Sequence, residues 1–475
     1  MGFIFGGNPF ASPNLLVPLV MFGWIPVVIY LFSRYPARRA IVISFIVAWL
    51  YLPQAVLPIP GIPDYDKIAA TCYGILLATF IFDVGRFNSF RFSWIDVPIV
   101  IWCVSPFASS LANDLGPYDG MAAVLGQTVT WGIPYFLGRI YLNSLNGMRE
   151  LAIGIFVGGL SYIPLCLFEM RLSPQLHRII YGGTPGSDFS QTIRLGGYRP
   201  TVFLSHGLAV GAFMMAATLV GIWLWQTGTV KHLWNIPIKW LVGALFVTFI
   251  LTRSTGAYAL LAGGIAILFV GKNLRTAAPA FLLIAGIVVY LYINAVSGTY
   301  VADQIVESLS RVLPEDRVGS LEFRFNNEEL LSAKARERII FGWGGYGRAL
   351  IFGPDGSQLT IPDSLWINIF GQNGTVGLVS LFVTMLLPTL SLFWMRYPAR
   401  LWANKKVASA TVVALMTALY MVDCLINAMV NPIYILAAGG IAGLVLKRER
   451  INKTAQGKAG VERLIPSQRY AVQPR

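Results

Sequence analysis

The sequence predicts an all-α polytopic membrane protein, and three observations carry this prediction. Hydrophobic residues make up 56% of the 475 residues and charged residues only 12%, whereas a soluble protein contains about 25% charged residues. The apolar residues form runs of about 20, the length that a helix needs to cross the hydrocarbon core of a bilayer. Basic residues gather in every second connection between these runs, as they do in multi-pass proteins.

About thirteen apolar segments are long enough to be transmembrane helices when borderline cases are included. In chain order they are 14–33, 40–57, 67–84, 95–112, 118–142, 148–170, 200–225, 236–252, 255–271, 277–296, 364–395, 407–427 and 432–446. The N-terminus lacks a basic stretch followed by a small-residue cleavage site, so the first segment is expected to remain as a span. Residues 1–446 are therefore expected to form a single transmembrane domain.

The distribution of Lys and Arg predicts the orientation of the chain. The basic connections contain Arg34, Arg38 and Arg39; Arg86 and Arg91; Arg139 and Arg149; Lys231 and Lys239; Lys272 and Arg275; and Arg396, Arg400, Lys405 and Lys406. Basic loops stay in the cytoplasm, which places the N-terminus outside and the C-terminus inside. Residues 447–475 form a basic cytoplasmic tail that is expected to be disordered and to contact anionic lipid.

Two connections on the outer side are long, 171–199 and 297–363. Within the second, apolar residues recur at helical spacing, which predicts amphipathic helices at 300–313 and 321–340. The glycine-rich stretch 342–347 follows. A connection as long as 297–363 is typical of a functional loop rather than a simple link between helices.

The net charge of +14 does not indicate a nucleic-acid partner, because the basic residues follow the predicted membrane topology. The cysteines argue against a disulfide framework, because each lies within an apolar run, and no Cys/His spacing typical of a metal site is present. Neither a metal nor a cofactor is expected. The four cysteines are Cys72, Cys103, Cys166 and Cys424.

Several ionisable residues map to the outer half of the membrane or to its edge, and they come from different spans. Such groups cost about 2.5–3.5 kcal/mol at the centre of a transmembrane helix, and those that remain often line a polar cavity. Their convergence predicts a ligand-binding or catalytic site at the outer face. These residues are Glu169, Arg199, His206, Arg253, Asp363 and Asp423.

Two arginines at the same depth suggest an anionic ligand. Arg199 precedes Pro200, and Pro favours the first turn of a helix, so Arg199 is expected at a helix N-terminus, where an anion is attracted. Arg253 lies in the turn between two spans. Because Arg binds phosphate bidentately, the pair suits a diphosphate. The alternative is that both side chains snorkel to lipid headgroups.

Asp363 lies at the outer mouth of the eleventh segment. It is either the N-cap of that helix or a carboxylate that takes a proton from an acceptor hydroxyl. His206 is either packed among helices or lines the cavity, and Glu169 either lines it or pairs with Arg171. The remaining candidates for the cavity lining are Asp423, Arg324, Gly344, Gly345 and Tyr346.

Four motifs occur in order along the second half of the chain. They are Arg199-Pro200-Thr201 with His206-Gly207-Leu208-Ala209; Thr252-Arg253-Ser254-Thr255-Gly256; Arg324 to Ile340 leading into Gly342-Trp343-Gly344-Gly345-Tyr346-Gly347; and Asp363-Ser364-Leu365-Trp366-Ile367 followed by Gly374-Thr375-Val376-Gly377. In kind and order they resemble the bacterial O-antigen ligase and O-antigen polymerase superfamily of membrane glycosyltransferases. The first half of the chain is similar only as a run of spans.

The resemblance implies a GT-C-like fold in a bacterial inner membrane, with the site on the periplasmic side. It implies an inverting glycosyltransferase that uses a polyprenyl-diphosphate-linked oligosaccharide donor and a saccharide acceptor, without a metal. Arg199 and Arg253 would hold the donor diphosphate, and Asp363 would be the base. Ligases of the superfamily carry His where this chain has Asp363, so polymerisation of O-antigen or exopolysaccharide repeat units is favoured over ligation.

Two alternatives remain open at this point. One is a ligase that transfers glycan to lipid A core or to protein. The other is a transporter or flippase for lipid-linked sugars, which is expected to show two related halves with polar sites near the middle of the membrane. The expected partners beyond the substrates are membrane lipids and other polysaccharide assembly proteins.

Overall fold

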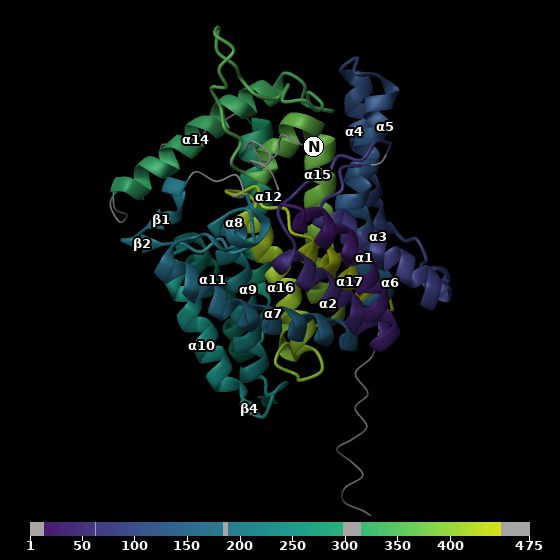
Figure 1. Cartoon of the computed structure of the whole chain (residues 1–475), viewed down its shortest axis with the longest axis vertical. Helices are drawn as coiled ribbons and strands as arrows, with labels where there is room; N and C mark the ends of the chain where they lie inside the picture. Colours follow the sequence, from purple (N-terminus) through teal and green to yellow (C-terminus); the bar gives the residue numbers. More distant parts are fainter. Residues whose placement is uncertain (1–13, 62, 184–188, 298–314, 448–475) are drawn as a thin grey trace, which may run out of the picture.

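The computed structural model describes residues 14–61, 63–183, 189–297 and 315–447. Within them the secondary structure is almost entirely helical, as Figure 1 shows. The strands form two short antiparallel hairpins, which are β1 (Ile193–Arg194) with β2 (Gly197–Tyr198) and β3 (His232–Leu233) with β4 (Ile236–Pro237). The all-α prediction is therefore confirmed.

Seven described helical segments are long and apolar enough, by length and composition, to cross a membrane. They belong to α1 (Leu16–Arg34), α4 (Val97–Ala112), α7 (Leu145–Leu172), α9 (Gly207–Gln226), α11 (Thr255–Leu274), α12 (Ala278–Leu291) and α15 (Leu365–Ser391). Short turns extend α4, α12 and α15 to their full membrane length. The chain is accordingly a multi-pass membrane protein.

Shorter helices occupy the other predicted segments. They are α2 (Ala37–Tyr51), α3 (Lys67–Phe82), α5 (Gly116–Gln127), α6 (Ile133–Tyr141), α10 (Ile238–Leu251), α16 (Ala408–Asp423) and α17 (Pro432–Lys447). Every one of the thirteen predicted segments thus contains helix. Whether each crosses the whole bilayer is a separate question, and the count of thirteen spans stays a prediction.

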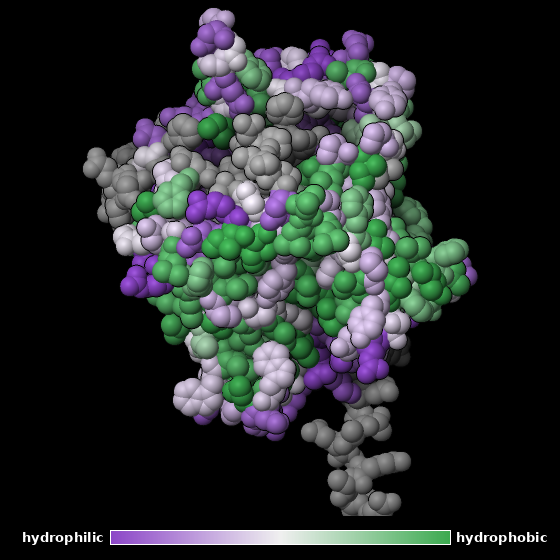
Figure 2. Space-filling view, viewed as in Figure 1, coloured by the Kyte–Doolittle hydropathy of each residue, from purple (hydrophilic) through white to green (hydrophobic). Residues whose placement is uncertain are grey.

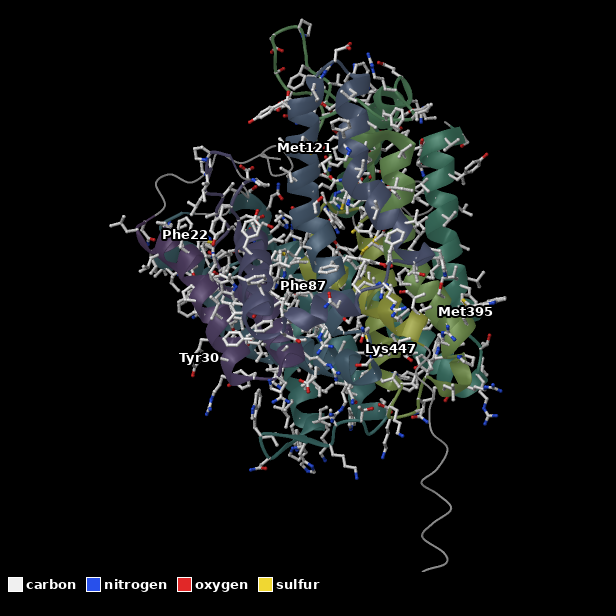
Figure 3. All side chains as sticks on the ribbon, turned by 90° about the vertical axis from the view of Figure 1, so that its right-hand side faces the viewer. Phe22, Tyr30, Phe87, Met121, Met395 and Lys447 are labelled. Atoms are coloured by element: carbon white, nitrogen blue, oxygen red, sulfur yellow. The ribbon has the colours of Figure 1, made fainter. Side chains whose placement is uncertain are left out.

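The apolar residues divide between a buried interior and an exposed belt. α16 and α17 are almost completely buried at the centre of the bundle. Around them, exposed apolar side chains such as Phe22, Tyr30 and Met395 point outward, as Figure 3 shows. Figure 2 shows hydrophobic atoms across the middle of the molecule and hydrophilic atoms at both ends. Lipid removes the cost of exposing such a belt, which water would impose.

The predicted outer and inner connections lie at opposite ends of the molecule. The helix α14 (Glu315–Arg336) lies at the top of Figure 1, and the β3–β4 hairpin lies at the bottom. α14 confirms that the 321–340 region is largely helical, although the helix begins earlier and ends earlier than predicted. The predicted helix at 300–313 and the tail after residue 447 fall outside the described residues.

Two local predictions have clear outcomes. The four cysteines are free and buried, as expected. The segment predicted to begin at Pro200 is wrong at its start, because α9 begins at Gly207 and residues 200–206 form an irregular turn. The hydropathy pattern included the apolar residues of this turn in the helix, because hydropathy does not distinguish a helical backbone from an irregular one.

A buried ion pair lies on the predicted cytoplasmic side. The guanidinium of Arg139, in α6, donates to both carboxylate oxygens of Asp96, at 2.6 and 2.8 Å, and Tyr135 donates to the same carboxylate at 3.0 Å. The two charged side chains are only 7% and 2% exposed. Such a pair is stable in a low-dielectric interior only because both charges are hydrogen-bonded.

Candidate functional site

Arg253 is fixed at the N-terminal end of α11 by the β1–β2 hairpin. It lies in the turn between α10 and α11 with a left-handed backbone, φ 57°. Its guanidinium donates to the carbonyl oxygens of Arg194 and Leu195, at 2.9 and 3.1 Å. A Cβ atom at Gly197 would overlap this guanidinium, so a larger residue there would displace the Arg253 side chain from its present position. The half-buried side chain is thus held by hydrogen bonds to the hairpin.

Arg199 is buried and lies against the start of α9, although the prediction that Pro200 opens the helix is wrong. It follows β2, and its guanidinium donates to the carbonyl oxygen of Arg253 at 3.2 Å. Its aliphatic part packs where a Cβ atom at Gly207 would be. The side chain, rather than the chain direction, therefore brings this charge to the N-terminus of α9, where the helix dipole also attracts an anion.

His206 is the N-cap of α9. Its Nδ1 accepts from the backbone N–H of Leu208 at 3.0 Å, so the ring proton lies on Nε2, which donates to Gln191. Burial, followed by the charges of Arg199, Arg324 and Arg194, lowers the pKa of His206 to about 4. His206 is thus a neutral capping residue inside a group of guanidinium charges.

Arg324 and Asp363 form the other side of the site. Nε of Arg324, on α14, lies 3.6 Å from the carboxylate of Asp363, and its Nη1 donates to the carbonyl oxygen of Ile426 at 3.2 Å. Both charged side chains remain partly exposed, at 30% and 37%. The long helix α14 therefore places Arg324, another predicted site residue, beside Asp363.

Asp363 is not the cap of α15. The N-cap is Ser364, whose hydroxyl donates to Glu328 instead of capping, while the N–H of Leu365 donates to the carbonyl oxygens of Cys424 and Asn427. The carboxylate of Asp363 is left to face Arg324. Burial raises the pKa of Asp363, and the Arg324 guanidinium partly opposes this shift. A carboxylate with a raised pKa is a better base than an ordinary Asp.

Asp423 lies at the C-terminus of α16 and is buried. Its carboxylate accepts from the side-chain amide of Asn427 at 2.8 Å, and it interacts electrostatically with Arg324. The 424–427 turn links Asp423 to the start of α15, because carbonyls of this turn bind Leu365.

Glu169 supports the site and does not line it. Its side chain is fully buried at the end of α7, and one carboxylate oxygen accepts from the N–H groups of Gln175 and Leu176. The other accepts from Thr201 and Val202, at 2.8 and 2.7 Å. Both the cavity-lining role and the pairing with Arg171 are therefore wrong, since four backbone N–H groups use the carboxylate.

The glycine-rich stretch lies against other helices. Gly344, in a left-handed conformation, packs on Leu115 between α4 and α5, and its N–H donates to the carbonyl of Gln372 in α15. Exposed Tyr346 donates to Asp119 of α5, and Gly345 is also exposed. These residues lie beside α4 and α5, whereas the arginines lie beside β1, β2 and α11, on the other side in Figure 1.

α15 is interrupted where this stretch meets it. Gly374 has φ 63° and ψ −161°, and a Cβ atom there would overlap the carbonyl of Ile340. The N–H groups of Thr375 and Val376 donate to the carbonyls of Ile339 and Ile340. Gly374 therefore permits a close backbone approach that a larger residue would block.

Two residues of the site escaped the sequence prediction. Arg194 lies on β1 and adds its charge near His206, but the hairpin is too short to give a strand pattern. Glu328 is 6% exposed, and its carboxylate accepts from Ser364, Trp366 and Tyr290. Its position one helical turn after Arg324, on an outer helix, was the available signal. Glu328 thus attaches α14 to the start of α15 through these hydrogen bonds.

The sequence matches no protein-family model, and no curated protein is similar enough to be a relative. Within the part of the chain that the structure describes, no carboxylate lies at ion-pair distance from Arg194 or Arg253. The site combines an excess of guanidinium charge with one partly exposed carboxylate, an arrangement that suits an anionic ligand and proton abstraction.

Proposed function

We propose that the protein is an inverting glycosyltransferase that uses a polyprenyl-diphosphate-linked saccharide at the outer face of a bacterial inner membrane. The observation that carries the proposal is that Arg199 contacts Arg253, that Arg324 lies beside Asp363, and that the charges of Arg199 and Arg324 both act on His206. A diphosphate needs several guanidinium donors, and a sugar hydroxyl needs a base.

The proposed reaction follows from these roles. Arg199 and Arg253 bind the diphosphate of the donor. Asp363 takes the proton of an acceptor hydroxyl, whose oxygen forms a bond to the anomeric carbon while the bond from that carbon to the diphosphate oxygen breaks. The configuration inverts, and the lipid diphosphate leaves with the bonding electron pair. The guanidinium charges stabilise the negative charge that grows on it.

Polymerisation of repeat units is the preferred form of this reaction, and transfer to lipid A core or protein is the alternative. The two reactions differ in the acceptor. In polymerisation the acceptor is a second lipid-linked glycan. Purified protein in lipid nanodiscs, supplied only with the lipid-linked repeat unit, should produce a ladder of longer glycans. Product that forms only when lipid A core or a protein acceptor is added would support ligation instead.

The diphosphate role is tested with lysine variants. Arg199→Lys and Arg253→Lys should each lower turnover roughly 100-fold or more, because a point charge does not reproduce the planar guanidinium. Arg178→Lys is the matched control, since Arg178 is exposed on the nearby helix α8 (Leu176–Tyr181). Full activity of both lysine variants, if they fold normally, would contradict the proposal. Transport of the intact donor without formation of a new glycosidic bond would indicate a flippase.

The proposal also requires the site to lie outside. Reporter fusions within 342–360 should report a periplasmic position, and fusions after Lys447 a cytoplasmic one, because the basic connections lie on the side of the tail. The reverse result would place the site in the cytoplasm and contradict the proposed donor geometry.

A further inference from the structure

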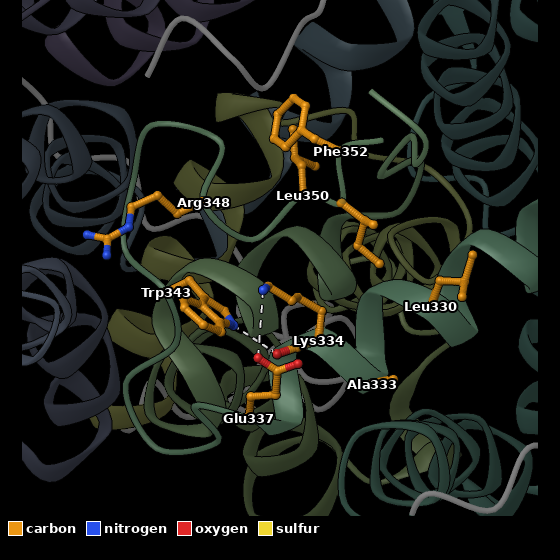
Figure 4. A pocket seen from close by; sticks show the side chains of 9 residues that line it. Leu330, Ala333, Lys334, Glu337, Trp343, Arg348, Leu350 and Phe352 are labelled. Atoms are coloured by element: carbon orange, nitrogen blue, oxygen red, sulfur yellow. Dashed lines mark hydrogen bonds and ion pairs between the residues drawn. The ribbon is translucent and has the colours of Figure 1, made fainter. Parts of the chain in front are cut away.

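A second feature of the outer region is an open groove of about 680 Å³ between α14 and the segment 343–352. It lies away from the arginine site, and Figure 4 shows it from close by. The groove falls within the range of volumes of small-molecule sites, about 300–1,000 Å³. The residues used below are Leu330, Lys334, Glu337, Trp343, Ile351 and Phe352.

The groove has an apolar side and a polar side. Leu330 and Phe352 are 53% and 52% exposed, and Ile351 lies beside them. On the other side, the Lys334 ammonium lies 4.1 Å from the centre of the Trp343 ring and 3.7 Å from Glu337. A sugar ring likewise has apolar and polar surfaces, because its C–H faces are apolar and its edge carries hydroxyl groups.

On the polar side, Trp343 is fixed by a hydrogen bond, whereas the Lys334–Glu337 ion pair can be replaced by contacts to a ligand. The Trp343 indole N–H donates to the carbonyl of Lys334 at 2.8 Å, which fixes the ring against α14. The Lys334–Glu337 pair is long and its side chains are 28% and 57% exposed. Partly exposed pairs contribute little to stability, so hydroxyl groups of a ligand can replace this contact.

Two segments of the chain, α14 and 352–362, connect the groove to the proposed catalytic residues. Arg324 and Lys334 lie on the same helix, α14, ten residues apart, which corresponds to about 15 Å along the helix axis. The opposite wall of the groove leads back to Asp363 through 352–362, which is attached to α14 because Ile361 donates to Asn327. A chain of several sugars that starts at Asp363 would therefore follow α14 into the groove.

We propose that this groove binds the distal sugars of the acceptor oligosaccharide while its end reacts at Asp363. The inference rests on the proposed function and adds the part of the substrate that the groove takes. Apolar sugar faces pack on Phe352 and Leu330, and hydroxyls bond to Lys334 and Glu337. An acceptor that is long enough to reach the groove therefore binds more tightly than a short one.

The test compares a disaccharide acceptor with an octasaccharide acceptor of the same repeat. In the wild type the octasaccharide should have the lower KM. Phe352→Ala and Lys334→Ala should each raise KM for the octasaccharide roughly tenfold, the effect of losing a small buried apolar or polar contact. KM for the disaccharide, KM for the donor and kcat should stay unchanged, because neither residue reaches Asp363.

The control is Ile179→Ala. Ile179 is 60% exposed on α8 and does not line the groove, so its variant should leave both acceptors unaffected. Transfer that occurs with equal KM for both acceptor lengths, or variants that change both equally, would overturn the groove proposal and leave the glycosyltransferase intact. Absence of any transfer would instead count against the proposed function. Octasaccharide binding, measured directly on the inactive Asp363→Asn protein, should show the same dependence on Phe352; binding of phospholipid or peptide in its place would also overturn the proposal.

Discussion

Arg139 and Arg253 both lie near helix ends in this bundle, but their surroundings differ. Arg139 forms a bidentate pair with Asp96, and the two side chains are almost fully buried. Arg253 donates to backbone carbonyls of a short hairpin, and no described carboxylate pairs with it. The first arrangement neutralises a charge, and the second fixes a charge in position without neutralising it. Changes at the first should therefore affect stability, and changes at the second should affect activity.

The largest effect is expected at Asp363. Asp363→Asn should lower turnover about 100- to 10,000-fold, because a general base contributes that factor. Stability should change little, since Asp363 does not cap α15 and its pair with Arg324 is partly exposed. Turnover and thermal unfolding of the same preparation measure both quantities. Near-normal product would show that the base lies elsewhere.

The pH dependence adds a separate test of the same residue. Because burial raises the pKa of Asp363, the rate should fall with decreasing pH at a higher pH than the ordinary Asp value of about 3.9. The sign follows because protonation removes the base. Asp363→Asn should have no such acidic limb. A limb that persists unchanged in the variant would belong to another group.

The next largest effect is expected at the buried pair, and it should be on stability. Arg139→Ala leaves Asp96 buried without its partner, which costs about 3–5 kcal/mol. Thermal unfolding in detergent measures the loss, while turnover per folded molecule should be retained. The double variant Asp96→Leu with Arg139→Met should recover much of the stability, because it removes both charges. If Arg139→Ala unfolds at the same temperature as the surface variant Arg178→Ala, the buried pair does not contribute to stability as proposed.

A change at Glu169 should affect both stability and activity, because Glu169 is buried like Arg139 and also supports the candidate site. Glu169→Gln replaces one acceptor oxygen by a donor, which leaves backbone N–H groups unsatisfied at about 1–3 kcal/mol each. Activity should fall as well, because Thr201 and Val202 fix the turn that follows Arg199. Unfolding and turnover should decline together, and a loss in only one of them would contradict a supporting role.

The smallest effect is expected at His206. His206→Leu removes the N-cap of α9 and should cost about 0.5–2 kcal/mol of stability, whereas His206→Asn retains a capping side chain. The two variants are compared by thermal unfolding. Equal losses would show that the ring packing, and not the hydrogen bond to Leu208, is what stabilises the helix start.

The sequence by itself determined the class of the protein and the approximate position of its helices. Hydropathy is a local property that adds up along a segment, so a run such as 148–170 indicates its helix without knowledge of its neighbours. It also predicted a site at which ionisable residues of different spans converge; in the structure Arg199 contacts Arg253, and Asp363 lies beside Arg324.

Only the tertiary structure decided what each polar group does. Ser364, not Asp363, is the N-cap residue of α15, but its hydroxyl donates to Glu328, and the N–H of Leu365 donates to carbonyls of the 424–427 turn. Glu169 is used by four backbone N–H groups, two of which lie more than 30 residues away. The physical reason is that a hydrogen bond depends on the position of both partners, and the position of the second partner is set by helix packing rather than by the local sequence.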